Sequence, residues 1–557
     1  MQPVTLAERG VAPSAAVRYA KHRPDTPLGS SVTSQSLRAS TLISLAASLA
    51  VGFAAIFHFG ADANWDLRNY HLYNAYALLE GRLGIDVFPM LQAYLNPALD
   101  VPFYLAVVHL GIYPAHGLLG LYFGLFVWVV FLFNRHLLLA ALPASRPGTV
   151  LALAVAATAV GVTGAAGASQ AITTFNEIQT ALLVVASIAL VLPDAEGRPP
   201  RARRIALAGL LMGLAVGLKL TAMVYLVGAC AALLPWRLRR EEIRALVVYG
   251  LAAAAGILAS HGAWSWVLYQ RFGNPVFPFF NAIFRSPWES PHNFADMRFF
   301  PATAWGYLTY PLDWAVHPST AISELPFRDP RLALLLGSAF VLLVIHLTLW
   351  RQARAVLLVV GFAVVSYAVW LVRFSILRYG VPLEVMAGAL LVLVVAAPLR
   401  AGLIAPVLAS CLAALSAITL VAYTHWPDWG RIPLAEGYRV AMPPIAADAT
   451  VILAGVPVSH VVPFLPEGRH RFIGLNGWST AEGPRREAAV AALSHASGPV
   501  WALVVRDQGV DGLLAEIGWA TENARCTPVH ATLDPGRIDL CPVVPAADAA
   551  TTPARGP

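Results

Sequence analysis

Residues 41–60 read TLISLAASLAVGFAAIFHFG, a run without Asp, Glu, Lys or Arg that is long enough to cross a membrane as a helix. A dense polar and aromatic segment, DANWDLRNYHLYN, follows directly at residues 62–74. One or two charges would be enough to end a membrane helix. The number of polar side chains here therefore indicates chemistry placed at a membrane surface.

The composition of the whole chain is that of a membrane protein. Hydrophobic residues make up 58% of the 557 residues and charged residues only 12%, too few to cover a soluble protein of this length. The apolar runs far exceed the ~10 residues of a transmembrane β-strand, so we expect an all-α polytopic membrane protein. The net charge of +7 lies largely in short loops between apolar runs. That pattern is an orientation signal, and we expect no nucleic-acid partner.

Loop charge predicts the topology. The basic loops at residues 198–204 and 237–240 mark the cytoplasmic side, and Lys219 interrupts the apolar stretch between them. We expect two short helices there, with Lys219 near the far side, where its ammonium either serves a site or snorkels to the interface. About eleven spans result, with the N-terminus inside and the C-terminus outside. The other spans are 41–60, 116–133, 149–165, 177–193, 245–269, 331–349, 355–372, 381–399 and 402–423, and the short run 98–112 is expected to be re-entrant or interfacial.

These spans divide the chain into four parts. We expect a disordered cytoplasmic tail (1–40), a membrane domain (41–424) with external loops 61–115 and 270–330, a small extracytoplasmic α/β domain (425–545) and a disordered tail (546–557). In the third part, short strands begin near Thr450, Pro499 and Ile538, and a helix near Glu487. Cys526 and Cys541 could form a disulfide if this part lies outside, a question that the sequence leaves open.

The polar segment after the first span has a helical pattern. Continued as a helix, it places Asp66, Asn69, Tyr70, Tyr73, Ala77 and Glu80 on one face and leucines on the other. Such a helix would lie along the membrane surface with its polar stripe upward, either as part of a site or as an amphipathic connector.

Several residues here resemble a known family. Asp66, Tyr70 and Gly81, directly beyond the first span, resemble the first external loop of the GT-C glycosyltransferases, in the branch of protein O-mannosyltransferases and aminoarabinose lipid A transferases. Further similar elements follow in the same order and cover most of residues 40–400. They are Asn96-Pro97-Ala98-Leu99, Gly213 to Lys219, and Arg378-Tyr379-Gly380-Val381-Pro382.

The resemblance implies a GT-C-like fold and an enzyme that moves a sugar from a polyprenyl-phosphate donor to an acceptor outside the membrane, with inversion at the anomeric carbon. The sequence departs from the family pattern at two positions. Leu67 follows Asp66 where many members carry a second acid, and Asn96 stands where a basic residue or His is common. These departures put a metal held by an acidic pair in doubt and obscure which group meets the donor phosphate. No cofactor is certain, and a divalent metal stays open.

Glycosyl transfer itself requires a carboxylate to deprotonate the acceptor hydroxyl and cations to stabilise the departing phosphate. Asp66 is the candidate base, and Lys219 and Arg378 are the candidate cations, with Arg68 and Arg82 behind them. The remaining candidate substrate-binding residues are Tyr70, Asn96, Tyr379 and Glu177, the last because related enzymes place an additional acid in that loop. Structural alternatives are a helix cap for Asp66 or Glu177 and an interface arginine for Arg378. His71 and His261 lack partners at metal-ligand spacing, and we interpret both as structural.

The sequence thus favours a glycosyltransferase of a bacterial inner membrane, with a lipid, glycan or protein acceptor. One alternative is a non-catalytic lipid or polysaccharide transporter, which would place ionisable residues in mid-span and show repeated halves. Another is a polysaccharide polymerase or ligase, for which His292, Arg298 and His317 in the late loop are candidate residues.

Overall fold

The computed structural model describes residues 34–234, 239–348, 354–476, 483–496, 498–506, 508–534 and 536–546. The chain divides into two compact units, residues 1–44 and 45–557. The described part of the first unit is the beginning of helix α1 (Ser34–Phe59), which includes the last residues of the expected tail 1–40. Most of that tail, and residues 547–557 of the expected C-terminal tail, lie outside the described residues. Everything below concerns the second unit.

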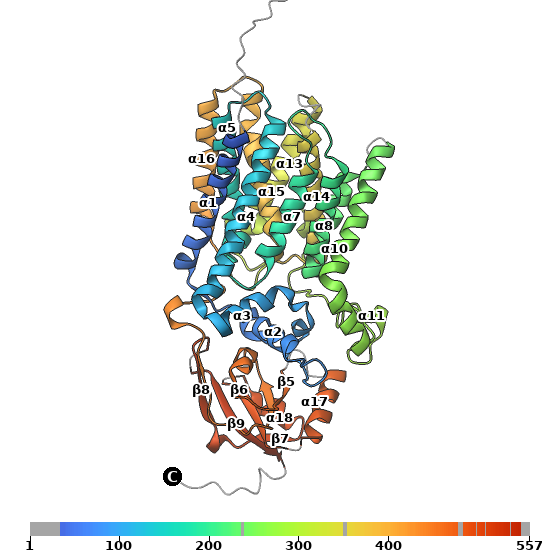
Figure 1. Ribbon diagram of the computed structural model, residues 1–557, viewed down its shortest axis with the longest axis vertical. Coiled ribbons are helices and arrows are strands. Elements are labelled where there is room, and N and C mark those ends of the chain that lie inside the picture. The colour runs from blue at the N-terminus through green and yellow to red at the C-terminus, as the bar shows by residue number, and fades with distance from the viewer. Residues whose placement is uncertain are drawn as a thin grey trace, which may run out of the picture. The chain divides into compact units, whose positions relative to one another are not determined.

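Each apolar segment expected to span the membrane lies in a helix. After α1 these helices are α4 (Ile112–Ala141), α5 (Pro147–Val162), α7 (Glu177–Val191), α8 (Ala202–Leu218), α9 (Met223–Leu233), α10 (Arg240–Phe272), α13 (Arg331–Thr348), α14 (Arg354–Arg373), α15 (Val381–Arg400) and α16 (Pro406–Tyr423), seen together as a bundle in Figure 1. Within the described residues, six helices are long and apolar enough to cross a membrane, and five apolar helices are shorter. The membrane-type helical fold is therefore confirmed, while the count of about eleven spans stays a prediction.

Small residues bring α8 and α10 close together. A Cβ on Gly209 or Gly213 of α8 would lie 2.2 or 2.0 Å from a backbone oxygen of α10, and one on Gly256 of α10 would lie 2.3 Å from an oxygen of α8. Such close backbone approach is how membrane helices gain van der Waals contact where lipid offers no hydrophobic driving force. The packing fixes the end of α8, where Lys219 follows.

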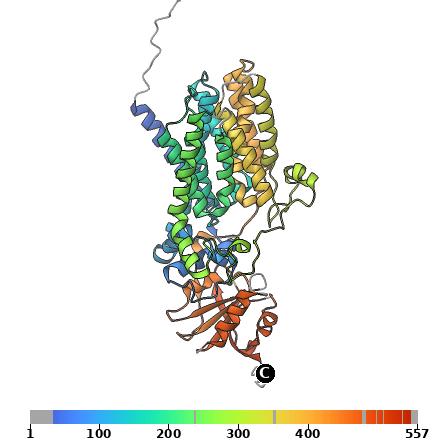
Figure 2. The same cartoon turned by 90° about the vertical axis from the view of Figure 1, so that its right-hand side faces the viewer.

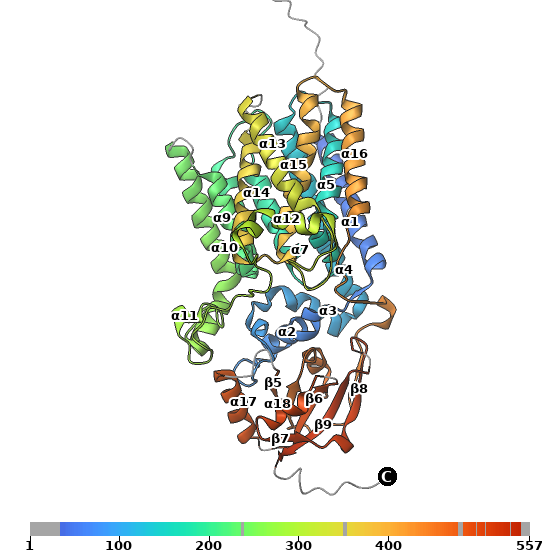
Figure 3. The ribbon, with the colours of Figure 1, turned by 180° about the vertical axis from the view of Figure 1, so that it is seen from behind.

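Of the three regions predicted to be external, the first, the third and the part of the second that contains α11 (Asn281–Phe284) lie at one end of the bundle (Figure 1), whereas the part of the second that contains α12 (Ala304–Val316) lies alongside it (Figure 3). The first contains α2 (Leu72–Leu79) and α3 (Asp100–Leu110), which contact each other. The second is the long loop after α10, in which α12 packs against α13. The side of the membrane that this end faces stays a prediction.

The segment after the first span does not form the predicted surface helix with an exposed polar face. Residues Leu67–His71 make a wide π-helical turn before α2, and Tyr70, Tyr73 and Ala77 on the expected polar face are buried. Leu78 and Leu79 are instead 43% and 47% exposed. The C-terminal sheet covers the stripe, because the turn Ser459–Phe464 packs against both the π-helical turn and α2. The prediction of a solvent-facing stripe was therefore wrong.

The C-terminal region is a mixed sheet with helices α17 (Pro484–Ser494) and α18 (Val510–Ala515) (Figure 2). Its strands are β3 (Val440–Ala441), β4 (Thr450–Ala454), β5 (Arg471–Leu475), β6 (Val500–Val505), β7 (Trp519–Thr521), β8 (Thr527–Ala531) and β9 (Ile538–Pro545). They pair in the order β3-β8-β9-β6-β4-β5, with β7 beside β9, and β4 is parallel to both β5 and β6. Strands and a helix therefore occur where the sequence predicted them, and a disulfide joins Cys526 to Cys541.

The sheet docks directly on the loop at residues 61–115. Val87 pairs with β5, its N–H donating to the Phe472 oxygen (3.0 Å) and its oxygen accepting from the Gly474 N–H (2.8 Å). A short ribbon of β1 (Ala61–Asp62) and β2 (Arg431–Ile432) also joins the exit of α1 to the chain that follows α16. Since residues 45–557 form one compact unit, the boundary expected at 424/425 stays a prediction.

Candidate active site

Two candidate residues that lie far apart in the sequence meet at one end of the bundle. Asp66 precedes the π-helical turn, and Arg378 lies in the 3₁₀ turn Leu377–Gly380 that leads into α15. Asp66 Oδ2 accepts hydrogen bonds from Arg378 Nη1 (2.5 Å) and from the Tyr70 hydroxyl (2.6 Å). A helical spacing of four places Tyr70 over Asp66, and tertiary packing supplies the arginine.

The surroundings keep Asp66 ionised. Burial alone would raise the pKa of this carboxyl, but the Arg378 guanidinium and the hydrogen bond from Tyr70 outweigh it and lower the pKa below its usual value. Burial and the neighbouring Asp66 charge raise the pKa of Tyr70 well above its usual value. At neutral pH the site thus presents a carboxylate held by a protonated phenol and a guanidinium.

Arg378 packs against two aromatic rings that contact each other. Its guanidinium carbon is 4.7 Å from the ring centre of Phe175 and 5.5 Å from that of Trp429. Its Nη2 is 3.6 Å from Glu324 of the long loop, and its buried Nε has no hydrogen-bond partner among the described residues. Aromatic walls exclude water around the cation and strengthen its interaction with any anion that reaches it.

Lys219 occupies the break between α8 and α9. Its Nζ donates to the Phe175 oxygen (2.6 Å), forms an ion pair with Glu177 and lies 5.6 Å from the centre of the Tyr379 ring. Glu177 is the first residue of α7, so the additional acid predicted in this loop is the partner of Lys219. Phe175 therefore contacts both candidate cations, one through its ring and one through its carbonyl.

The side chain of Asn96 mainly holds the backbone together. Its Oδ1 accepts from the Ala98 N–H (3.1 Å), and its Nδ2 donates to the oxygens of Gly217 (2.9 Å) and Ser260 (2.8 Å). Both amide hydrogens are thus used to tie the first external loop to α8 and α10. Asn96 positions the end of α8, two residues before Lys219, against α10 rather than presenting a free group.

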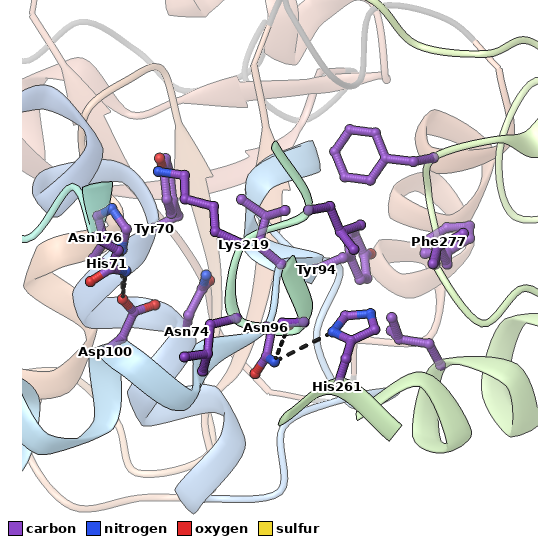
Figure 4. A pocket seen from close by; sticks show the side chains of 17 residues that line it. Tyr70, His71, Asn74, Tyr94, Asn96, Asp100, Asn176, Lys219, His261 and Phe277 are labelled. Atoms are coloured by element: carbon purple, nitrogen blue, oxygen red, sulfur yellow. Dashed lines mark hydrogen bonds and ion pairs between the residues drawn. The ribbon is translucent and has the colours of Figure 1, made fainter. Parts of the chain in front are cut away.

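A cavity opens beside Tyr70 and Lys219 (Figure 4). One wall carries His71, Asn74 and Asp100, and the opposite wall carries Tyr94 and Phe277. Asn96 and His261 also line this cavity, and Lys219 extends toward Tyr70 from the break after α8.

Solved structures resemble this chain over nearly its whole length. ArnT from Cupriavidus metallidurans bound to undecaprenyl phosphate matches with a TM-score of 0.50 and 13% identity, covering 90% of this chain and 98% of that one. The chain has the fold of ArnT. The apo state of ArnT gives the same TM-score and identity, with 92% and 99% covered.

Other comparisons are weaker or negative. The Archaeoglobus fulgidus oligosaccharyltransferase in its apo form matches with a TM-score of 0.44 and 12% identity, over 84% of this chain and 69% of that chain. No protein-family model and no curated protein matches the sequence. The resemblance to the GT-C enzymes predicted from the sequence is thus confirmed through ArnT, at the level of the fold.

Arg68 and Arg82, which the sequence predicted as additional cations of the site, form ion pairs outside it. Arg68 binds Asp534 of the C-terminal region (2.6 Å), and Arg82 binds Asp86 (2.6 Å). The first pair joins the loop 61–115 to the C-terminal region, and Arg82 also reaches that region by donating from Nη2 to the His470 oxygen (2.6 Å). The prediction that these arginines support the phosphate site was therefore wrong in geometry.

The other acidic residue of the opening segment is also structural. Asp62 is fully buried, and its carboxylate accepts from the side chains of Asn64 and Thr174. Leu67, which stands where many family members carry a second acid, is fully buried in the apolar core. Across the part of the chain that the structure describes, no three His, Cys, Asp or Glu side chains are grouped to hold a metal ion.

Proposed function

We propose that this chain is an integral-membrane glycosyltransferase that moves a sugar from a polyprenyl-phosphate-linked donor to a lipid, glycan or protein acceptor. The observation that carries the proposal is the contact of Asp66 with Arg378 and Tyr70 in a fold shared with ArnT. The ArnT structure holds undecaprenyl phosphate, a polyprenyl phosphate, which supports the same donor class here.

The chemistry follows from the geometry. Asp66 removes the proton from the acceptor hydroxyl as the oxygen attacks the anomeric carbon, and the bond from that carbon to the phosphate oxygen breaks. The electron pair leaves with the polyprenyl phosphate, and single displacement inverts the anomeric centre. Tyr70 holds the carboxylate in place, because its hydroxyl donates to Asp66 Oδ2.

Arg378 and Lys219 would stabilise the departing phosphate. Arg378 keeps one buried N–H without a partner among the described residues, and its planar fork suits two phosphate oxygens. Each cation is balanced by a carboxylate, Asp66 or Glu177. This pairing holds the cations at the outer end of the bundle without leaving buried charge uncompensated before the anionic donor arrives.

The long loop supports one alternative acceptor chemistry. Arg298 lies 3.7 Å from Glu324, which itself lies 3.6 Å from Arg378, so the loop contributes charges to the site. A polymerase or ligase of lipid-linked glycans would use such a loop to hold a second glycan. A ladder of products rather than a single added sugar would favour this alternative.

The decisive experiment measures sugar transfer in membranes from labelled undecaprenyl-phosphate sugars. Asp66→Asn keeps the shape of the side chain but removes the base, and it should lower the rate about 10²- to 10⁴-fold. Asp313→Asn, at an exposed position of α12, serves as the matched control and should leave the rate unchanged. Full activity of a correctly inserted Asp66→Asn protein would refute the mechanism.

We also propose that the site faces the outside of a bacterial inner membrane. The basic loops predict this orientation, and the Cys526–Cys541 disulfide is typical of an oxidising compartment. A periplasm-specific reporter fused after residue 425 should be active. Activity of a cytoplasm-specific reporter at that position would refute the orientation.

A further inference from the structure

Three polar atoms on the wall of the cavity lack partners. His71 Nε2, Asn74 Oδ1 and His261 Nε2 have no hydrogen-bond partner among the described residues, although their side chains are only 6%, 3% and 6% exposed. All three side chains line the same cavity (Figure 4). Leaving a buried polar group unpaired costs about 1–3 kcal/mol, so three together indicate a ligand that pairs with them.

The chemistry of one of these atoms is fixed by its neighbours. His71 Nδ1 lies 2.8 Å from Asp100 Oδ1, which also accepts from Asn176 Nδ2 at 2.8 Å. A carboxylate can only accept, so Nδ1 carries the ring proton. In the neutral imidazole, Nε2 is then a lone pair on the cavity wall, and it pairs with a hydrogen-bond donor.

The opposite wall has a different character. Tyr94 and Phe277 lie with ring centres 4.9 Å apart and planes perpendicular, and Phe279 continues the aromatic surface. Aromatic faces pack against apolar C–H groups, whereas the histidine wall offers hydrogen bonds. A cavity with these two walls fits a saturated ring that has one apolar face of C–H groups and hydroxyl groups around its rim.

We infer that His71, held in one tautomer by Asp100, accepts a hydrogen bond from one hydroxyl of the donor sugar and thereby selects the sugar. This inference rests on the proposed function and adds to it a group that determines specificity. Asp66 remains the base, and His71 transfers no proton. A sugar that lacks this hydroxyl leaves Nε2 unpaired and binds more weakly.

The test measures binding to full-length protein in nanodiscs, so that it does not depend on turnover. The probes are undecaprenyl phosphate and its glucose, galactose, mannose and 4-amino-4-deoxyarabinose esters. The wild type should bind at least one sugar ester about tenfold more tightly than undecaprenyl phosphate. The deoxy analogues of that sugar then locate the hydroxyl that is read.

Variants of His71 and Asp100 separate hydrogen bonding from packing. His71→Asn keeps a group near Asp100 but removes Nε2, so the preferred ester should bind about three- to tenfold more weakly, the loss of one hydrogen bond. His71→Gln places an acceptor near the Nε2 position and should recover part of this loss. Asp100→Asn can donate to Nδ1 and so reverse the tautomer, which should weaken binding although the imidazole stays.

The controls distinguish failure of the inference from failure of the proposed function. His109→Asn, at an exposed position of α3, should match the wild type with every probe, and the affinity for undecaprenyl phosphate should be equal in all variants. One deoxy analogue should bind His71→Asn and the wild type equally well.

If neither undecaprenyl phosphate nor any ester binds the wild type, the proposed function is wrong. If undecaprenyl phosphate binds but no sugar adds affinity, the inference alone is wrong. The inference alone is also wrong if His71→Asn binds every ester as tightly as the wild type does. It is likewise wrong if His71→Asn loses as much affinity for undecaprenyl phosphate as for the preferred ester.

Discussion

The ion pair between Lys219 and Glu177 can be separated into a structural part and a functional part. Their side chains are 17% and 4% exposed, so removing one partner leaves a nearly buried charge. Lys219→Met should lower the free energy of unfolding by roughly 3 kcal/mol, the lower end of the range for a broken buried pair, because Lys219 retains some contact with water. Changing Glu177 to Gln as well removes the orphaned charge and should restore most of this loss.

Activity should not follow stability in this series. If Lys219 stabilises the departing phosphate, the double variant Lys219→Met/Glu177→Gln will be stable but slow, with transfer reduced about 10²- to 10³-fold. Glu177→Gln alone leaves the ammonium without its carboxylate, and it should bind undecaprenyl phosphate more tightly than the wild type. Lys21→Met, which changes the only other lysine in the sequence, is the control.

The assay combines unfolding curves in mild detergent with transfer rates from labelled undecaprenyl-phosphate sugar in membranes. A double variant that regains both stability and activity would show that Lys219 only neutralises Glu177, and the assignment of this lysine to the phosphate would be wrong. A single variant as stable as the wild type would refute the electrostatic reasoning.

Three further outcomes are expected. Because the pKa of Asp66 is lowered, its carboxylate stays ionised as the pH falls through the usual carboxyl range; a pH–rate profile should show no acid limb near pH 5, and the stability from its ion pair should be lost only below the unfolded-state value of 3.8. Replacing Cys526 by Ser opens a disulfide of sequence separation 15, so denaturant unfolding should show that the variant is less stable than the oxidised wild type by about 3 kcal/mol. A wild type that loses no stability when its disulfide is reduced would contradict this expectation. Gly213→Ala should destabilise the protein in thermal unfolding, because its Cβ would lie 2.0 Å from a backbone oxygen, whereas Gly250→Ala, with open space around it, should be neutral or slightly stabilising.

Local patterns predicted part of the candidate site. A helical spacing of four residues put Tyr70 beside Asp66, and the structure shows that contact. The break at Lys219 and the basic turn at Arg378 were visible because charge is rare next to apolar runs. The contact between Arg378 and Asp66 could not be predicted, because 312 residues separate the two in the chain and local sequence patterns do not extend over that interval.

The partners that complete the site were missed for the same reason. Trp429 and Glu324 come from segments without a motif, and each reaches Arg378 only through tertiary packing. His71 was interpreted as structural because no metal-ligand spacing accompanied it. Its partner Asp100 lies 29 residues later in the chain, at the start of α3. The buried polar stripe also escaped prediction, because the sheet that covers it is encoded almost four hundred residues later, as the 390-residue separation of the Ser459–Asn69 hydrogen bond shows.

The long separation of Asp66 and Arg378 has a consequence for how the protein is made. Ribosomes add about 5–20 residues each second, so the 312 residues between the two partners take roughly 16–62 s to synthesise. During this interval the carboxylate has left the first span while its guanidinium does not yet exist. A chain that stops before residue 378 therefore lacks the ion-pair partner of Asp66, so the site is completed only after most of the membrane domain has been synthesised.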